Sequence, residues 1–147
     1  MKSLKTFLKS KNYVRIALKL TETNHFEIKA RINGITGRFI LDTGASNTCV
    51  DMEKLEFFKM VSETSEVKAA GAGATEMDTS ISTRNHIQIG KWTKKRQPIV
   101  LFDLVHVNRA LISHNTLPVD GIIGADILKK GKAVIDYDKK RLFLKLK

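Results

Sequence analysis

The sequence predicts a small, mostly β fold with one or two short helices, folded as a single domain. Three observations indicate this class. Short runs of alternating apolar and polar residues recur along most of the 147-residue chain. Turn compositions such as TETN and Asn-Gly separate these runs. Helical spacing of apolar residues is confined to short segments, and the chain length suits one compact domain.

The first part of the chain is predicted to form a three-stranded meander. Tyr13 to Leu20 nearly alternates, and residues 25–32 (HFEIKARI) place four apolar side chains on one face. Asn33-Gly34 is a strong two-residue hairpin signal, and it leads into the run ITGRFILD. We therefore expect three strands between residues 13 and 42, the last of them ending at Asp42.

Further elements are predicted along the rest of the chain. Asp51 to Val61 changes to helical spacing, with Asp51 as the N-cap. NHIQIGKW and QPIVLFDLVHV are typical of strands, the second with Pro98 at its entrance, whereas RALISHNTLP has the composition of a loop. We then expect a short helix from about Ala125 to Lys130, stopped by Gly131, and a final hairpin that turns at Asp138-Lys139.

Composition bounds the class of protein. No apolar run approaches the roughly 18 residues needed to span a bilayer, and MKSLKTFLKSKN lacks the apolar region of a signal peptide, so we expect a cytoplasmic protein without a membrane partner. A single cysteine, Cys49, excludes an internal disulfide, and its apolar surroundings predict a buried side chain. The four histidines have no metal-binding spacing, so neither a metal nor a cofactor is expected.

The net charge of +11 raises the hypothesis of a basic nucleic-acid-associated protein. The basic excess lies at the two ends: residues 1–20 carry six bases and no acid, and residues 91–147 carry thirteen bases against five acids. Residues 21–90 instead carry ten acids and seven bases. Few aromatic residues lie among the bases, and no nucleic-acid module is recognisable. The distribution therefore favours solvated surface charge over a nucleic-acid partner.

The run FILDTGAS needs a chemical explanation. An apolar strand that ends in Asp-Thr-Gly-Ala presents the Asp42 carboxylate from an apolar wall into a turn. Thr43 offers a hydroxyl that could brace the turn, and Gly44 permits close backbone approach and a positive φ. A carboxylate placed in this way is oriented but poorly solvated, which is costly unless it has a function.

Three features together resemble the retropepsin-like aspartic proteases, a family that includes retroviral proteases and related cellular and bacterial enzymes. FILDTGAS, the Gly-rich AAGAGATEMD and VDGIIGADIL occur in the family's order, and about eighty residues separate DTG from IIG, as in the cellular members. The resemblance covers residues 13–147 and implies a single-domain acid protease barrel that pairs as a two-fold dimer. The basic segment 1–12 has no counterpart in it.

The resemblance also implies a function. It predicts an aspartic endopeptidase that acts on a peptide or protein substrate as a homodimer, in which two Asp42 carboxylates, one from each subunit, activate a water. Thr43 would form a hydrogen bond across the two-fold axis. The other implied site residues are the active-site loop Thr43, Gly44, Ala45 and Ser46, the flap Ala70, Gly71, Ala72, Gly73 and Ala74 within residues 70–78, and the supporting second signature Ile122, Ile123 and Gly124.

The sequence departs from the retroviral pattern at one ion pair. The retroviral enzymes carry two acids after Asp-Thr-Gly-Ala, one of which pairs with an arginine after the second signature. Here Ser46-Asn47 and Ala125-Asp126 stand at these places, so the ion pair is absent and we expect Asp126 to cap its own helix. The last strand, RLFLKLK, places Leu142, Leu144 and Leu146 on one face, and we expect it to be an unpaired edge available to a second copy. The alternative function is a non-catalytic, protease-like binding or dimerisation domain.

Overall fold

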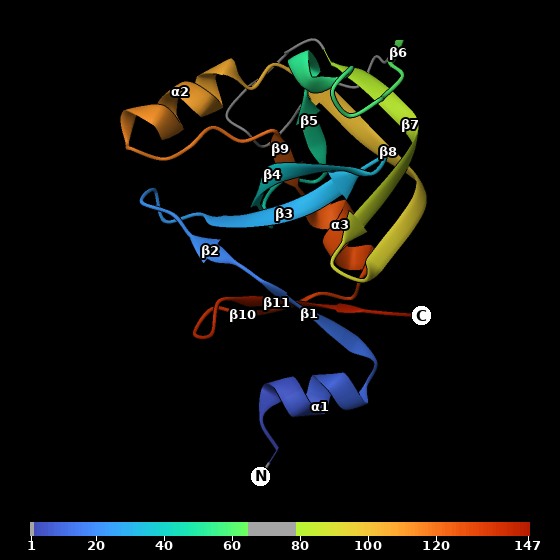
Figure 1. Cartoon of the computed structure of the whole chain (residues 1–147), viewed down its shortest axis with the longest axis vertical. Helices are drawn as coiled ribbons and strands as arrows, with labels where there is room; N and C mark the ends of the chain where they lie inside the picture. The colour runs from blue at the N-terminus through green and yellow to red at the C-terminus, as the bar shows by residue number, and fades with distance from the viewer. Residues whose placement is uncertain (1, 65–78) are drawn as a thin grey trace.

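A computed structural model of the chain describes residues 2–64 and 79–147 (Figure 1). Helices are α1 (Leu4–Ser10), α2 (Val105–Ser113) and α3 (Ala125–Lys130), with a 3₁₀ turn η1 (Met52–Lys54). The strands are β1 (Tyr13–Ala17), β2 (Lys19–Leu20), β3 (Phe26–Ile32), β4 (Ile35–Leu41), β5 (Cys49–Asp51), β6 (Glu63–Thr64), β7 (Ser80–Ile89), β8 (Trp92–Phe102), β9 (Gly121–Ile123), β10 (Val134–Asp136) and β11 (Arg141–Lys145). The mostly β class is confirmed, with one more helix than expected.

The main sheet closes into a barrel. Its strand order is β2-β3-β4-β9-β5-β8-β7-β6, and an additional pairing of β3 with β7 joins the two ends of the central six strands. The pairings of β4 with β9 and of β5 with β8 are parallel. Side chains inside the ring form the larger apolar core, which includes Ile28, Phe39, Ile99 and Ile123. The predicted acid protease barrel is thereby confirmed.

The β3–β4 hairpin forms as the sequence predicts. Its strands turn through Asn33 and Gly34, whose φ angles of 52° and 84° both lie in the left-handed region. The last pair before the turn is Ile32 with Ile35. Residues of β3 alternate between buried and more exposed positions, as a strand against a core requires. This hairpin places β4 between β3 and β9, with Asp42 directly after the end of β4.

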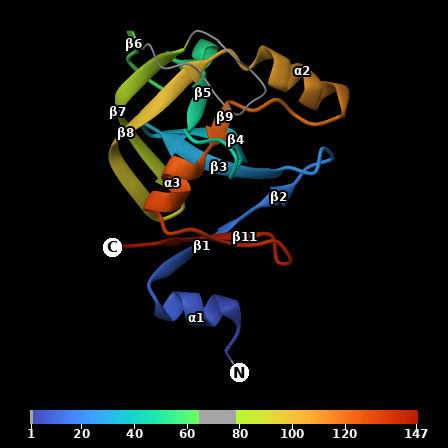
Figure 2. The same cartoon turned by 180° about the vertical axis from the view of Figure 1, so that it is seen from behind.

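The predicted three-stranded meander is confirmed only in part: β2, at the end of the predicted first strand, pairs antiparallel with β3, but β1 does not belong to this sheet. β1 does not pair with β3; it pairs antiparallel with β11, and the second sheet has the order β1-β11-β10. This sheet lies between the barrel and α1 in both views (Figures 1 and 2). Alternation of apolar and polar residues predicts that a segment is a strand, but it does not predict which strand is its partner. Here β11 pairs with β1 at five positions.

The expected unpaired edge is also wrong, because β11 is the central strand of this second sheet. Leu142 and Leu144 are buried in the main core, and Leu146 packs against it. Phe143 and Leu8 of α1 are buried as well, although neither belongs to that core. Both faces of β11 are therefore covered within one chain, and the edges of the sheet are β1 and β10.

One predicted helix is shorter than expected, one helix was not predicted, and one prediction is confirmed. The predicted helix from Asp51 to Val61 shortens to η1 followed by turns, although Asp51 caps it by accepting a hydrogen bond from the Glu53 N–H. The predicted strand end and loop around residues 103–113 instead form α2, because the Asp103 carboxylate accepts a hydrogen bond from the Val105 N–H and Leu111 packs into a second apolar cluster. Helix α3 and its Gly131 C-cap are as predicted.

The turn between β10 and β11 confirms the final hairpin. Among the described residues, no helix is long and apolar enough to cross a membrane.

Candidate active site

The sequence motifs around Asp42 and Gly124 meet at the ends of two parallel strands. Asp42 follows the last residue of β4, and β4 pairs in parallel with β9 over Phe39–Leu41 and Gly121–Ile123. The Asp42 N–H donates to the Ile123 carbonyl oxygen at 3.0 Å. Segments about eighty residues apart in the sequence are therefore neighbours in the fold. Both strands are buried here, so the apolar wall expected before Asp42 is present.

The Asp42 carboxylate is half-buried and is oriented by its own turn. Its Oδ1 accepts a hydrogen bond from the Gly44 N–H at 2.9 Å, and no other described residue donates to this carboxylate. The Ala45 N–H donates to the Asp42 carbonyl oxygen at 3.3 Å. One carboxylate oxygen is thus fixed by the backbone, which leaves the second oxygen available to a substrate or a water.

Two expected roles in the turn are wrong. Gly44 does not have a positive φ; instead, a Cβ built at this position would lie 3.3 Å from Asp42 Oδ1, so glycine leaves room for the carboxylate. Thr43 is exposed, and its hydroxyl has no hydrogen-bond partner among the described residues, so it does not brace the turn. The bracing comes from the Gly44 N–H and from the residues that follow the loop.

Thr48 and Asp126 connect the loop to helix α3. Thr48 is fully buried, and both its N–H and its hydroxyl donate to Asp126 Oδ1, at 2.9 Å and 2.7 Å. The Gly124 N–H in turn donates to the Thr48 hydroxyl at 3.0 Å. The expectation that Asp126 caps its own helix is wrong: Gly124 is the N-cap of α3, and no side chain caps this end. Asp126 Oδ1 accepts from the adjacent Ile127 N–H, and its two bonds to Thr48 tie the loop to the helix.

The same chain of hydrogen bonds continues to β8 and to the end of α3. Gln97 Nε2 donates to Asp126 Oδ2 at 3.2 Å, and Lys130 Nζ donates to Gln97 Oε1 at 2.7 Å. Sequence reasoning missed Thr48, Gln97 and Lys130. The available signals were weak: a threonine six residues beyond Asp42, and a glutamine where the basic half of β8 meets its apolar half. Thr48 and Gln97 are buried and Lys130 is exposed, and their hydrogen bonds stabilise the position of the loop that carries Asp42.

The second signature supports the loop through its backbone and through packing. The Ala125 N–H donates to the Ala45 carbonyl oxygen at 2.7 Å. A Cβ at Gly124 would lie only 2.7 Å from that same oxygen, so the close approach requires glycine. Ile122 shares an apolar cluster with Ala45 and Cys49, whereas Ile123 faces the main core.

Cys49 lies beside this support. It is 4% exposed, which confirms the expected buried side chain, and its burial raises the pKa of its thiol from 9.0 to about 12. A backbone hydrogen bond involving Ile122 opposes this increase, and the charges of Asp126, Asp42 and Asp51 add to it. The thiol is therefore a protonated packing group at neutral pH rather than a nucleophile.

The remaining predicted site residues are placed as follows. Ser46 is exposed on the loop. Ala70, Gly71, Ala72, Gly73 and Ala74, predicted as the flap, lie outside the described residues; on either side of the undescribed segment, β6 and β7 pair antiparallel. Within residues 2–64 and 79–147, no group of three or more His, Cys, Asp or Glu side chains is arranged to hold a metal ion.

The family follows from comparison with known proteins. A family model described as aspartyl protease matches residues 28–127, a span that includes the loop at Asp42 and the second signature through Gly124. The chain belongs to this family. Its barrel and its two paired motifs identify it as a member of the retropepsin-like aspartic proteases. Comparison with curated proteins gives no significant match.

Solved structures support the fold. The retropepsin-like aspartic protease from Rickettsia conorii is 22% identical, with a TM-score of 0.57 over 90% of this chain and 89% of that chain. The EIAV protease complexed with the inhibitor HBY-793 is 20% identical, with a TM-score of 0.50 over 75% and 90%. The retroviral protease-like domain of Ddi1 from Leishmania major is 16% identical, with a TM-score of 0.51 over 80% and 86%.

Proposed function

We propose that the chain is an aspartic endopeptidase, acting as a homodimer in which each subunit supplies one Asp42 carboxylate. The observation that carries this proposal is the position of that carboxylate, half-buried at the end of a barrel strand with Oδ1 held by the Gly44 N–H. The sequence contains one Asp-Thr-Gly, whereas aspartic protease chemistry uses two carboxylates. The second carboxylate then comes from another copy, related by a two-fold axis.

The two carboxylates would share one proton, because like charges at such close range cannot both ionise. The ionised Asp42 accepts a proton from water as the water oxygen attacks the peptide carbonyl carbon. The protonated Asp42 donates its proton to the developing oxyanion. As the C–N bond breaks, the Asp42 that accepted the water's proton gives it to the leaving nitrogen, and the re-forming carbonyl returns the other proton to its carboxylate. The Gly44 N–H keeps Oδ1 oriented, so the other oxygen can handle the proton.

Features beside the loop support the homodimer. A shallow hollow of about 340 Å³ lies next to Thr43, and Ala125, Leu128, Ala133 and Ile135 contribute apolar atoms to its wall. The exposed Thr43 hydroxyl has no partner in the part of the chain that the structure describes. A second copy that covers this hollow would bury apolar surface and could give Thr43 a hydrogen bond across the axis, as the resemblance implies.

Incubation with a diverse peptide library tests the activity. We expect cleavage by the parent chain, inhibition by a statine-type transition-state analogue, and no cleavage by Asp42→Asn, because an amide cannot accept the proton of the water. An Asp42→Asn variant that cleaves at the parent rate would refute the assignment. A parent chain that binds peptides without cleaving them would indicate the non-catalytic binding domain instead.

Concentration dependence tests the homodimer separately. Specific activity should rise with protein concentration until the dimer saturates, in parallel with the dimer fraction measured by sedimentation. Full activity from a sedimenting monomer would leave the protease assignment intact but would contradict the shared site.

A further inference from the structure

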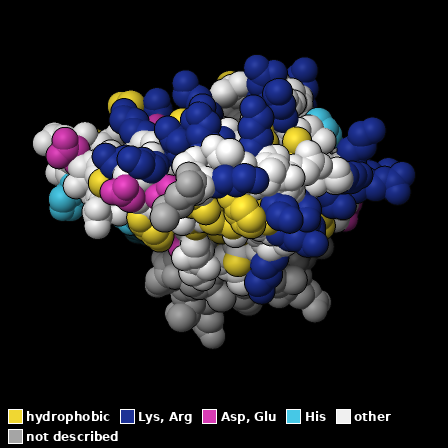
Figure 3. Space-filling view, turned by 90° about the horizontal axis from the view of Figure 1, so that it is seen from below, with side chains coloured by type: hydrophobic (Ala, Val, Ile, Leu, Met, Phe, Trp, Pro, Cys, Tyr) yellow, Lys and Arg dark blue, Asp and Glu magenta, His cyan; other side chains and the backbone are white. Residues whose placement is uncertain are grey.

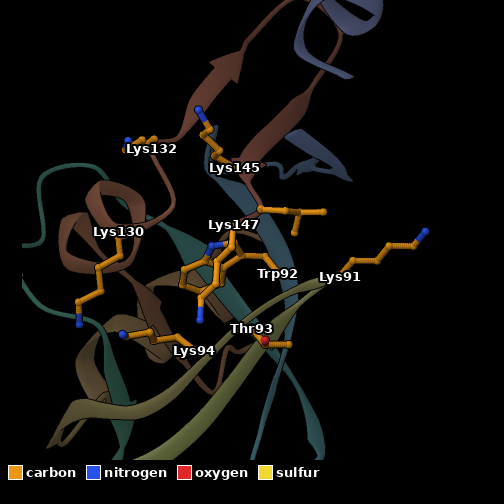
Figure 4. A pocket seen from close by; sticks show the side chains of 9 residues that line it. Lys91, Trp92, Thr93, Lys94, Lys130, Lys132, Lys145 and Lys147 are labelled. Carbon is orange, nitrogen blue, oxygen red and sulfur yellow. The ribbon is translucent and has the colours of Figure 1, made fainter. Parts of the chain in front are cut away.

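A second hollow, which shares only Lys132 with the hollow beside Thr43, has lysines at six of its nine lining positions. It has a volume of about 660 Å³ and forms where the start of β8, the end of α3 and the end of β11 come together (Figure 4). The lining residues are Lys91, Trp92, Thr93, Lys94, Lys130, Lys132, Lys145, Leu146 and Lys147. This volume falls within the range of about 300–1,000 Å³ that is typical of small-ligand sites.

Among residues 2–64 and 79–147, no Asp or Glu side chain lines this lysine hollow. None of its six lysines forms an ion pair with a carboxylate among the described residues. Lys130 Nζ bonds only to the neutral Gln97 Oε1, at 2.7 Å. Lys and Arg side chains also cover much of the neighbouring face, where they outnumber acidic side chains (Figure 3). Like charges around one hollow repel each other, and a bound anion would remove that repulsion.

The lining residues define the chemistry of that anion. The cations are all lysines, which act as compact point charges; no arginine contributes the planar fork that binds a carboxylate or a phosphate in one fixed geometry, so the attraction depends on charge density. Trp92 is only 6% exposed, so its indole face cannot serve as a stacking platform for a nucleic-acid base. The hollow therefore favours an anion of high charge density that carries no nucleic-acid base. Phosphates linked directly to one another have this property, whereas acidic residues of a peptide are separated by backbone and side-chain stems.

We propose that the lysine hollow is a binding site for a linear polyphosphate group. In Figure 4 the side chains of Lys94 and Lys130 end in the same part of the view, whereas Lys91 and Lys145 extend away from Trp92. A chain of phosphates would draw the first two together with Lys132, and it would leave the outer lysines to contact its ends. This site shares Lys132 with the hollow beside Thr43 but contains no residue of the loop at Asp42, so it does not depend on the proposed protease activity.

Trp92 supplies a direct readout, because it is the only tryptophan in the chain and it lines the hollow. Titration with tripolyphosphate at constant low ionic strength should produce a saturable change in Trp92 fluorescence, while sulfate at matched ionic strength should not. Lys94→Glu with Lys132→Glu should weaken the affinity by about tenfold or more, since two attractive contacts become repulsive. The matched control, Lys5→Glu with Lys19→Glu, changes the net charge equally outside the hollow and should stay within about twofold of the parent.

Comparing the affinities of other ligands distinguishes a nucleotide from an inorganic chain as the source of the phosphates. ATP that binds as tightly as tripolyphosphate would support a nucleotide source, and weaker ATP binding would support an inorganic chain. Tighter binding of an oligothymidylate or an oligoglutamate of matched charge would overturn the proposal. Equal losses in the two double variants would overturn it too, because the effect would be one of net charge alone. Lys94→Gln with Lys132→Gln repeats the test with a milder change, and circular dichroism checks that each variant is folded.

Discussion

Replacing Asp126 by alanine tests whether the polar network holds the active-site loop. The change removes the acceptor of two hydrogen bonds from Thr48 and one from Gln97. Thr48 is fully buried, so water cannot readily replace the lost carboxylate at its N–H. Gln97 is 1% exposed, and its Nε2 loses the longer of its two hydrogen bonds while it keeps the one to the Pro98 carbonyl oxygen at 2.9 Å.

The expected loss follows from these contacts. A hydrogen bond to a charged acceptor contributes about 1.5–3 kcal/mol, and a buried donor left unsatisfied costs about 1–3 kcal/mol. The contributions overlap, so we expect the free energy of unfolding to fall by about 3 kcal/mol, a large part of the roughly 5–15 kcal/mol of a typical domain. For a chain of this length, that corresponds to a decrease in melting temperature of about 10 °C.

Denaturant unfolding followed by Trp92 fluorescence measures this loss. Asp126→Asn is the matched control, because its amide oxygen can still accept from Thr48. Its NH₂ group loses only the bond from Gln97, whose oxygen stays with Lys130, so we expect a loss of about 1 kcal/mol. A double-mutant cycle with Thr48→Val should show a coupling energy of at least about 1 kcal/mol. An alanine variant within about 0.5 kcal/mol of the parent would show that water substitutes for the carboxylate, and the proposed support would be refuted.

Three further predictions address the surrounding structure. Gly124→Ala should lower the free energy of unfolding by about 1–3 kcal/mol in denaturant titrations, because its Cβ would meet the Ala45 carbonyl oxygen, whereas Gly44→Ala should cost less; equal losses would contradict the crowding argument. Because the native pKa of Cys49 is raised to about 12 from 9.0, the native state keeps a proton that the unfolded chain loses, so stability should fall as pH rises above about 9. The stability advantage of the parent over Cys49→Ala should then narrow with pH, and a constant difference would argue against a buried thiol. Deleting β11 should abolish cooperative thermal unfolding rather than only weaken dimerisation, because this strand is central in its sheet; a folded monomer would contradict that placement.

The elements that sequence reasoning predicted correctly are those with local causes. Asn33 and Gly34 adopt left-handed angles that few other pairs tolerate, so the turn and the register of the β3–β4 hairpin follow from two residues. Helix α3 similarly ends where Gly131 follows its last basic residues. The strand that leads to Asp42 could be predicted because its apolar run is bounded by this hairpin on one side and by a turn on the other.

The elements that were wrong depend on distant partners. β1 alternates in a way that would suit β3, but its partner is β11 near the other end of the chain. Val105 and Val107 favour a strand by intrinsic propensity, yet α2 begins there, where Asp103 turns the chain by accepting from the Val105 N–H and Leu111 packs into an apolar cluster. Asp126 had a sufficient local explanation as a helix-capping residue, and only the fold shows that Thr48 competes for the same oxygen. When a residue already has a local explanation, its sequence gives no reason to look for a contact with a distant segment.

Lys132 connects the two proposed sites, because it lines both the lysine hollow and the hollow beside Thr43. If a second copy covers the hollow beside Thr43, Lys132 and Lys129 approach that copy, whose own charge is equally positive. Any salt would screen this repulsion, because charges interact over a range of only about 10 Å at 0.1 M ionic strength. A polyphosphate held in the lysine hollow would instead neutralise Lys132 directly, so at equal ionic strength it would favour assembly more than a simple salt. The basic surface and the half-complete active site are therefore linked through one side chain.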